Sequence, residues 1–226
     1  IYEALHRLFI RLQEARGELL RQNENLETLV KIRTEQLEYA KILLEEDIDR
    51  RKNLEDELRS IAERDTLTGL LNRRSMEVRT DSLLSRAGNK GSYSAMLYID
   101  LDHFKEVNDK MGHETGDRLL VEVSRRLSSA VRESDVVARI GGDEFVIVLG
   151  DLPDSGLAAI IAEKIRISIN LPFVFENTEV SVSPSIGVSI FPDDGKDMRS
   201  LLKKADAAMY SAKSKGRNTC CCFSGK

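Results

Sequence analysis

The chain has 226 residues, which is enough for one ordinary domain and an extension. Hydrophobic residues make up 41% of it, so a folded core is expected, and the formal net charge of -4 argues against recruitment of nucleic acid by a global basic field. The sequence contains no apolar run long enough to cross a membrane, and its only cysteines, Cys220 to Cys222, are adjacent and suit neither a disulfide framework nor zinc. These features predict a cytoplasmic protein whose cysteines act as small hydrophobic residues of a last strand.

Residues 1–62 are predicted to form one long helix that pairs with a second helix. They contain no proline, and apolar residues recur at alternating steps of three and four, which is the heptad pattern of a coiled coil. One helix cannot bury such a stripe by itself, so the simplest partner is a second copy of the chain in a homodimer. The predicted seam contains Leu5, Phe9, Leu12, Leu19, Leu26, Val30, Leu37, Ala40, Leu44, Leu54, Leu58 and Ile61, with polar Arg16, Asn23, Arg33, Asp47 and Arg51 at equivalent positions.

Two interpretations of this helix stand side by side. It is a plain dimerising stalk, or it is a stalk of marginal stability that a signal can shift, because polar residues in the seam lower stability while fixing register. The segment from Leu26 to Leu58 resembles the signalling helices that join sensor modules to output domains. We therefore expect a sensor module upstream of Ile1.

Residues 63–226 are predicted to form a second domain in which strands alternate with helices. Asp65 and Thr68 are interpreted as capping residues that, together with Gly69, end the heptad pattern. Helical patterns cover residues 72–85, 104–111, 117–131, 157–169 and 198–213, strand patterns cover residues 94–102, 136–140, 145–149, 173–175 and 180–191, and loops are expected at 88–91 and 112–116. This alternation predicts an α/β or α+β sandwich.

The stretch from Gly141 to Glu144 separates two strand patterns and is predicted to form a hairpin turn, because glycine tolerates positive φ. The turn would present Asp143 and Glu144 at a strand end, and Asp100 stands near the end of an earlier strand. If these strands are neighbours, the three carboxylates meet at one edge of a sheet. Carboxylates that converge from different segments suit magnesium-assisted phosphoryl chemistry. An ordinary acidic hairpin is the alternative interpretation.

The sequence Gly141–Phe145 resembles the signature of the GGDEF family, the diguanylate cyclases, and Asp65–Arg74 resembles the entry motif of that domain. The resemblance covers residues 65–223. It implies a central, mostly antiparallel sheet wrapped by helices, similar to the nucleotide cyclase core and the polymerase palm. It also implies condensation of two GTP molecules into cyclic di-GMP and two pyrophosphates.

The resemblance further implies a Mg²⁺ site, with Mn²⁺ as an alternative ion, at Asp100, Asp143 and the carbonyl of Leu101. In this interpretation Asp143 is also the proton acceptor for the attacking 3′-hydroxyl. Glu144 shares the metal or contacts the ribose.

Asn108 and Asp117 occupy the positions that read guanine in the family. A carboxylate at 117 would reject adenine, which lacks the N1–H donor and would leave the acid unpaired. His113, in the matching Gly-His-x-x-Gly-Asp loop, resembles a substrate contact, and a histidine that only helps the loop to pack is the alternative. Phosphate contacts are expected from the helix start at Phe104 and Lys105, from the backbone of Gly141 and Gly142, and from Lys213 and Arg217, which match the family's triphosphate clamp.

Arg132 and Asp135 stand at the offset where GGDEF proteins carry an inhibitory Arg-x-x-Asp site for the product, cyclic di-GMP. Arginine offers a bidentate fork to guanine or phosphate, and aspartate accepts hydrogen bonds from the guanine edge. Arg166 is a weaker second contributor. A surface ion pair is the alternative interpretation of this motif.

The sequence as a whole predicts a dimer-dependent diguanylate cyclase. A catalytically silent GGDEF module that acts as a receptor for GTP or cyclic di-GMP is the rival interpretation, although a silent copy has no need of the intact turn, Asp100 and Lys213 together. A purely structural coiled-coil adaptor would leave the acidic constellation unexplained.

Overall fold

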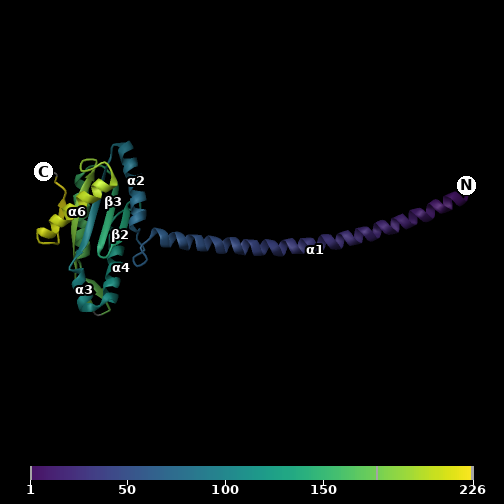
Figure 1. Cartoon of the computed structure of the whole chain (residues 1–226), viewed down its shortest axis with the longest axis horizontal. Helices are drawn as coiled ribbons and strands as arrows, with labels where there is room; N and C mark the ends of the chain where they lie inside the picture. Colours follow the sequence, from purple (N-terminus) through teal and green to yellow (C-terminus); the bar gives the residue numbers. More distant parts are fainter. Residues whose placement is uncertain (1, 177, 225–226) are drawn as a thin grey trace. The chain divides into compact units, whose positions relative to one another are not determined.

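The computed structural model describes residues 2–176 and 178–224, and gives the backbone alone for residues 2–5, 7–8, 53 and 55–60 of the first helix. The chain forms two compact units, Ile1–Arg59 and Ser60–Lys226. Figure 1 labels several of their elements.

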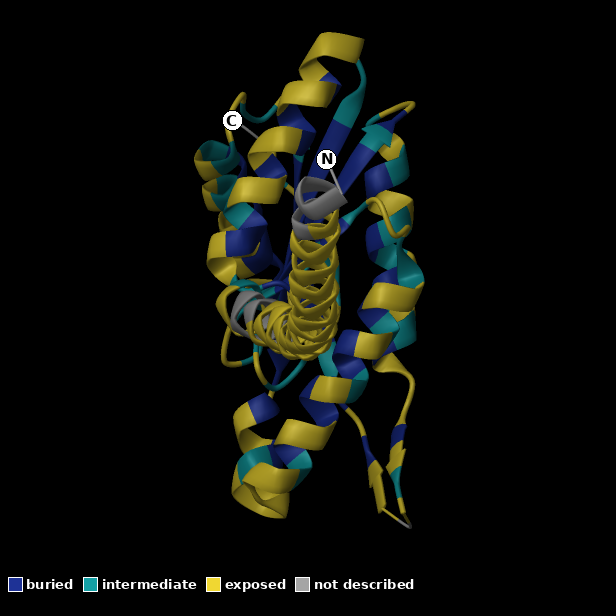
Figure 2. Ribbon diagram, turned by 90° about the vertical axis from the view of Figure 1, so that its right-hand side faces the viewer, coloured by how far each residue is buried: buried dark blue, intermediate teal, exposed yellow. Residues whose placement is uncertain are grey.

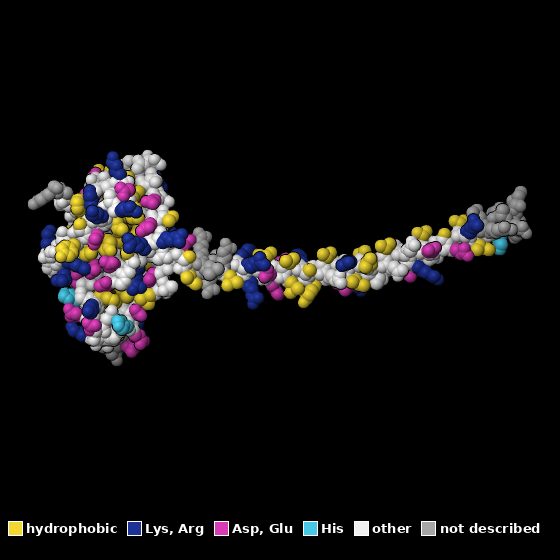
Figure 3. Space-filling model, in the orientation of Figure 1, with side chains coloured by type: hydrophobic (Ala, Val, Ile, Leu, Met, Phe, Trp, Pro, Cys, Tyr) yellow, Lys and Arg dark blue, Asp and Glu magenta, His cyan; other side chains and the backbone are white. Residues whose placement is uncertain are grey.

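Helix α1, Tyr2–Glu63, makes up the first unit and ends in the second. The predicted long helix is therefore confirmed. Within the single chain, its described large seam side chains from Phe9 to Leu54 are between 52% and 70% exposed. Hydrophobic side chains recur along this helix in Figure 3. The seam residues Leu5 and Leu58 lie outside the described side chains.

The second unit is organised around a five-stranded sheet with the order β2-β3-β1-β6-β7. Strand β1 lies at its centre and pairs antiparallel with β3 and β6, β2 pairs antiparallel with β3, and β7 pairs parallel with β6. The predicted mostly antiparallel sheet is thus confirmed. The strands are β1 Tyr93–Asp102, β2 Val136–Gly141, β3 Glu144–Leu152, β6 Ser183–Phe191 and β7 Cys220–Cys222, and a separate hairpin joins β4 Phe173–Phe175 to β5 Thr178–Val180.

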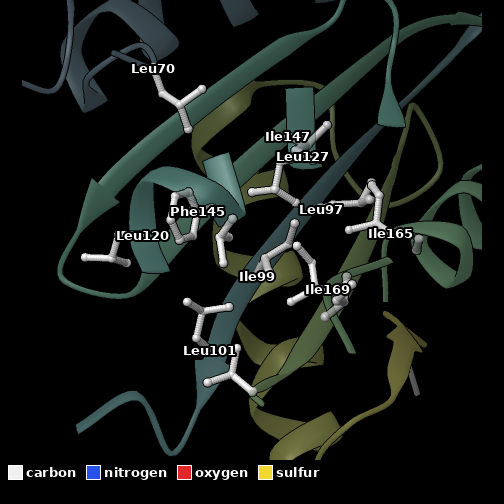
Figure 4. Close-up of a cluster of buried hydrophobic side chains, with 14 of the residues drawn as sticks. Leu70, Leu97, Ile99, Leu101, Leu120, Leu127, Phe145, Ile147, Ile165 and Ile169 are labelled. Carbon is white, nitrogen blue, oxygen red and sulfur yellow. The ribbon is translucent and has the colours of Figure 1, made fainter. Parts of the chain in front are cut away.

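Helices cover both faces of this sheet, which is why β1 reads as an almost continuous apolar run. Leu97, Ile99 and Leu101 point to the face packed by α4 and α5, whereas Met96 and Tyr98 point to the face packed by α2 and α6. Figure 2 shows buried residues concentrated in the strands and on the inward sides of the helices, and Figure 4 shows the first of these two cores. The helices are α2 Arg73–Lys90, α3 Phe104–Met111, α4 His113–Ala130, α5 Gly156–Asn170 and α6 Met198–Ser214.

Two glycine-containing segments that were predicted as loops are largely helical. Helix α4 begins at His113, because Gly112, with φ of +85°, already turns the chain, and Gly116 serves packing instead: a Cβ there would collide with the side chain of Asn108. Helix α2 continues through Gly88 to Lys90, and Gly91, with φ of +66°, forms its C-terminal cap.

Other boundaries also differ from the sequence prediction. The strand expected at 180–191 is divided between β5 and β6. Asp65 does not cap a helix: its carboxylate accepts hydrogen bonds from the backbone and hydroxyl of Thr68 within the turn, and Asn72 caps α2. No helix of residues 2–176 and 178–224 has the length and apolar character needed to span a membrane.

Candidate active site

The acidic residues of the GGDEF turn lie at the same edge of the sheet as Asp100. Strands β1 and β3 are neighbours, with Asp100 opposite Glu144, and the N–H of Leu101 donates to the carbonyl of Asp143 at 3.3 Å. Directly opposed residues of an antiparallel pair point to the same face, so Asp100 and Glu144 share the α6 side of the sheet. The carboxylates predicted to act together therefore come from two segments of the chain and meet at one strand end.

The turn itself is tighter than the four-residue break predicted from the sequence. Gly141 ends β2 and pairs with Glu144, which begins β3, so only Gly142 and Asp143 form the turn. Gly142 has φ of +52°, which favours glycine. A Cβ at Gly141 or Gly142 would have no atom within 4 Å, so the space beside the turn is open to a ligand.

A cavity of about 190 Å³ lies against this edge. It collects residues that were predicted for metal binding and for phosphate binding, from β1, the turn, the start of α3 and the end of α6. Its lining consists of Asp100, Leu101, Asp102, His103, Phe104, Lys105, Asp143, Lys213 and Arg217.

The carboxylate of Asp100 is nearly buried and is paired with a lysine. Its Oδ2 lies 2.7 Å from Nζ of Lys213, which stands in the last turn of α6, and its side chain is 11% exposed. Gly187 of β6 allows this helix to approach, because a Cβ there would collide with the α6 backbone. Burial raises the pKa of Asp100 above its usual value, the hydrogen bond from Lys213 lowers it, and the nearby Asp143 carboxylate raises it.

The donors at this edge fit a hard divalent cation. Asp100 and Asp143 offer carboxylate oxygens to the cavity, and Leu101 lines it beside them. Mg²⁺ is commonly held by one or two carboxylates and keeps several waters. No group of three or more His, Cys, Asp or Glu suited to a metal occurs among the described residues.

The predicted guanine-reading residues lie on helices α3 and α4, which pack against each other, and are not among the residues that line the cavity. Asn108 has a buried Oδ1 without a hydrogen-bond partner, and the backbone of Gly116 leaves room for this amide. Asp117 and His113 are exposed on the first turns of α4. A buried acceptor without a donor is unusual in a folded protein, and a ligand donor would satisfy it.

Asp102 was not singled out from the sequence, although it follows Asp100 by two residues. Its carboxylate accepts hydrogen bonds at 2.7 Å from the hydroxyls of Ser183 and Ser185, and at 3.0 Å from the backbone N–H of Asn218. The side chain is completely buried. Asp102 therefore ties β6 and the segment after α6 to the cavity, through contacts that span more than 80 residues and leave no local signal.

Arg139 was also missed. Its Nε donates to the carbonyl of Gly142 at 2.9 Å, and its Nη1 donates to both carboxylate oxygens of Asp65 at 3.0 and 3.2 Å. One guanidinium thus joins the turn that carries Asp143 to the turn that follows α1. The only sequence signal was an arginine placed just before the signature motif.

The Arg132–Asp135 motif lies at the start of β2, at the opposite end of that strand from Gly141. Asp135 is already engaged, because its carboxylate accepts the backbone N–H groups of Arg132 at 2.9 Å and Gly150 at 3.1 Å. Both motif residues line a surface cavity of about 270 Å³. Arg166 lies elsewhere, on α5 beside β7. Within one chain, the two predicted parts of the inhibitory site are therefore next to the two outermost strands of the sheet, β2 and β7.

Comparison with known proteins agrees with this geometry. The family described as diguanylate cyclase, GGDEF domain, matches residues 62–219. The bifunctional diguanylate cyclase/cyclic di-GMP phosphodiesterase MucR of Pseudomonas aeruginosa is 42% identical over 167 residues, covering 74% of this chain and 24% of MucR. The diguanylate cyclase TpbB of the same species is 40% identical over 170 residues, covering 74% of this chain and 39% of TpbB.

A solved structure is also similar over most of the chain. The coiled coil and GGDEF domain of DgcB from Caulobacter crescentus, in complex with c-di-GMP, has a TM-score of 0.69 and 27% identity, covering 78% of this chain and 93% of that one. The chain spans about a quarter of MucR and about two fifths of TpbB. On the family match and these similarities, the chain belongs to the GGDEF family of diguanylate cyclase domains.

Proposed function

We propose that this chain is a diguanylate cyclase that condenses two GTP molecules into cyclic di-GMP and two pyrophosphates. The observation that carries the proposal is the cavity in which Asp100 and Asp143 face Lys213 and Arg217. A cavity lined by both carboxylates and cations suits a triphosphate that arrives with a metal ion. The match to the cyclase family supports the same activity.

The proposed reaction gives different roles to the carboxylates and to the cations of the cavity. The 3′-hydroxyl of one GTP attacks the α-phosphate of another, so that a new O–P bond forms while the bond to the β-phosphate oxygen breaks and pyrophosphate leaves. Asp143 takes the proton of the attacking hydroxyl, and Glu144 stands beside it for the metal or the ribose. Lys213, Arg217 and Lys105 neutralise the phosphates, while the backbone of Gly141, Gly142 and Phe104 lets them approach.

A bound Mg²⁺ or Mn²⁺ would offset charge on the triphosphate and on the leaving pyrophosphate. Asp100, Asp143 and the carbonyl of Leu101 would hold it. Asn108 and Asp117 would read the guanine edge, with His113 as a further substrate contact. The unpartnered Oδ1 of Asn108 supports this assignment.

Each chain supplies one half site, so the proposed chemistry needs two chains. The exposed seam of α1 supports pairing through a coiled coil, which raises the local concentration of the second half site. We also propose that a sensor module precedes the helix and that GTP is the substrate. Cyclic di-GMP would inhibit the enzyme by binding at Arg132 and Asp135. The cavity beside this motif supports the feedback site.

The decisive experiment is incubation of the protein with GTP and Mg²⁺, followed by chromatographic separation of the nucleotides. We expect cyclic di-GMP from the wild type and none from Asp143→Ala, whose far-ultraviolet circular dichroism should match that of the wild type. If the wild type binds GTP but forms no product at any protein concentration, the chain is a nucleotide receptor and the cyclase proposal is wrong.

A further inference from the structure

Three consecutive residues after α6 have positive φ: Gly216 at +111°, Arg217 at +65° and Asn218 at +43°. The left-handed region is unfavourable for residues other than glycine, although asparagine tolerates it better than most. Such residues keep this conformation only where surrounding contacts hold it. The segment Gly216–Asn218, called here the phosphate loop, must therefore be fixed from outside.

Two contacts to Asn218 supply that fixation. Its backbone N–H donates to the buried carboxylate of Asp102 at 3.0 Å, and its side-chain Oδ1 accepts a hydrogen bond from Nη1 of Arg166 at 2.6 Å. Arg166 is itself held by a fork to Glu163, with distances of 2.9 and 2.7 Å, and its side chain is 20% exposed. Helix α5 thus contacts the loop through Arg166.

The residue next to Asn218 in this loop is Arg217, which lines the cavity together with Asp100 and Lys213. Arg166 does not line that cavity. Its contact with the loop is the side chain of Asn218, so we expect its effect on a bound phosphate to pass through Asn218 to Arg217.

We infer that Arg166 is a positioning residue, which holds the phosphate loop so that Arg217 meets the β- and γ-phosphates of GTP. The inference rests on the proposed function. It also reassigns Arg166, whose role was predicted from the sequence to be contact with the inhibitory product. Three guanidinium hydrogen bonds are already committed to Glu163 and Asn218, so a product contact would have to displace them.

Arg166→Ala should release the loop and weaken triphosphate binding without changing recognition of the base. Arg125→Ala is the matched control, because Arg125 makes the same fork to Glu122 three residues earlier, at 2.9 and 2.7 Å, on the exposed surface of α4. The probes are the α,β-methylene analogue of GTP, which cannot release pyrophosphate, and GMP, each measured with Mg²⁺ by titration calorimetry on the full chain.

We expect Arg166→Ala to raise the Kd of the analogue about tenfold, the size of effect typical for loss of a hydrogen bond to a charged group. The Kd of GMP should stay within about twofold, as should both values for Arg125→Ala. In steady-state turnover, Arg166→Ala should raise KM for GTP more than it lowers kcat.

Loop mobility gives a readout that needs no nucleotide. Hydrogen exchange of the free protein should accelerate over residues 215–219 in Arg166→Ala and in Asn218→Gly, and not in Arg125→Ala. Asn218→Asp keeps an acceptor for Arg166, and aspartate tolerates positive φ better than most residues. This variant should therefore keep the protection from exchange that the wild type has. The double variant Arg166→Ala with Asn218→Gly should exchange little faster than either single variant, because both substitutions remove the same hydrogen bond between Arg166 and Asn218.

The inference is overturned if exchange and analogue affinity match the wild type in Arg166→Ala, or if affinity for GMP falls as much as affinity for the analogue. A variant with unchanged KM but relieved inhibition by cyclic di-GMP would return Arg166 to a product site. Failure of the cyclase proposal looks different: the wild type would form no cyclic di-GMP, while the exchange comparison would still decide whether Arg166 holds the loop.

Discussion

At the scale of residues, Oδ1 of Asn108 is buried and has no hydrogen-bond partner in the free chain. Buried polar atoms without partners are rare because their desolvation is unfavourable. The space for this amide exists only because residue 116 is a glycine, within the first turn of α4. Under the proposed function this amide helps to read the base, and a Cβ at residue 116 would collide with it.

Gly116→Ala should displace the Asn108 amide and raise KM for GTP by about tenfold or more, since one directed hydrogen bond is lost. Gly88→Ala is the matched control on α2, because its Cβ would stand 3.6 Å from the ring of Phe191, an ordinary contact distance. Alanine is the better helix former, so this control should be as stable as the wild type or slightly more stable. Steady-state kinetics and thermal unfolding of both variants test the prediction, and equal KM values would contradict it.

Base choice is a second prediction at this scale. Asp117 stands exposed on α4, where a guanine edge could donate to it. We expect kcat/KM for GTP to exceed that for ATP by about 10–100-fold, because the N1–H of guanine can donate to this carboxylate whereas N1 of adenine is an acceptor. Asp117→Ala should lower this ratio mainly by slowing the use of GTP. Comparable rates with the two nucleotides in the wild type would refute the assignment.

At the scale of elements, the turn after α1 and the GGDEF turn are held together by Arg139. Its side chain is 12% exposed, and it hydrogen-bonds to both turns. Within the turn after α1, called here the entry turn, the backbone N–H of Asp65 donates to the carbonyl of Leu70. The backbone N–H of Arg139 donates to the carbonyl of Leu71, which connects the entry turn to β2. A displacement of the entry turn would thus be felt at Gly142, directly before Asp143.

Arg139→Ala should lower the free energy of unfolding by about 1–3 kcal/mol, because it leaves a partly buried carboxylate without its charged donor. Arg73→Ala provides the control: Arg73 pairs with Glu77 at 3.4 Å on an exposed helix face, and such pairs contribute less than about 1 kcal/mol. Urea unfolding of both variants checks the difference. A loss of activity in Arg139→Ala that exceeds its loss of folded protein would show that the Gly142 contact also shapes the turn.

The same contact has a defined pH dependence. Burial raises the pKa of Asp65, but hydrogen bonds from Thr68 and Arg139 outweigh it, so the folded-state pKa lies below the ordinary value of 3.8. The charged form is therefore stabilised by folding, and this stability is present above pH 3.8 and is lost as pH falls through the folded-state pKa. The difference in unfolding free energy between wild type and Asp65→Asn should be largest near neutrality and shrink below about pH 4. A difference that stays constant with pH would contradict this.

The elements also show what a single sequence can and cannot predict. The short helix 104–111, the hairpin around Gly142 and the last helix were predictable, because each has a strong local period or turn signal. Gly88 and Gly116 misled the prediction, since a glycine inside a helix looks the same in the sequence as one that turns the chain. The contacts of Asp102 and Arg139 join segments 74 to 116 residues apart, and no local pattern encodes such pairs.

At the scale of the whole molecule, the apolar seam from Phe9 to Leu54 and the acidic edge belong to different compact units. Under the proposed function, self-association through α1 and chemistry at Asp143 can therefore be disturbed separately. Exposure within one chain does not distinguish seam residues from others: Leu37 is 70% exposed and Tyr39, two residues away and off the seam, is 66% exposed. Only the heptad position separates them.

Leu37→Asp should weaken self-association by about tenfold or more, because it buries a charge at a coiled-coil seam, whereas Tyr39→Asp should leave it unchanged. Analytical ultracentrifugation measures the first effect. Under the proposed function, the specific activity of Leu37→Asp should fall steeply on dilution while that of Tyr39→Asp follows the wild type. Equal behaviour of the two variants would place the seam on another face of α1.

The division into two units has a further consequence in a cell that carries two alleles. A chain with Asp143→Ala keeps the whole of α1 and, under the proposed function, still occupies a partner that it cannot serve. With random pairing, the fraction of fully competent pairs falls as the square of the wild-type fraction, so the defective allele would be dominant negative. Removing its seam with Leu37→Asp on the same chain should make it recessive, because a defective half that cannot pair leaves its neighbours alone.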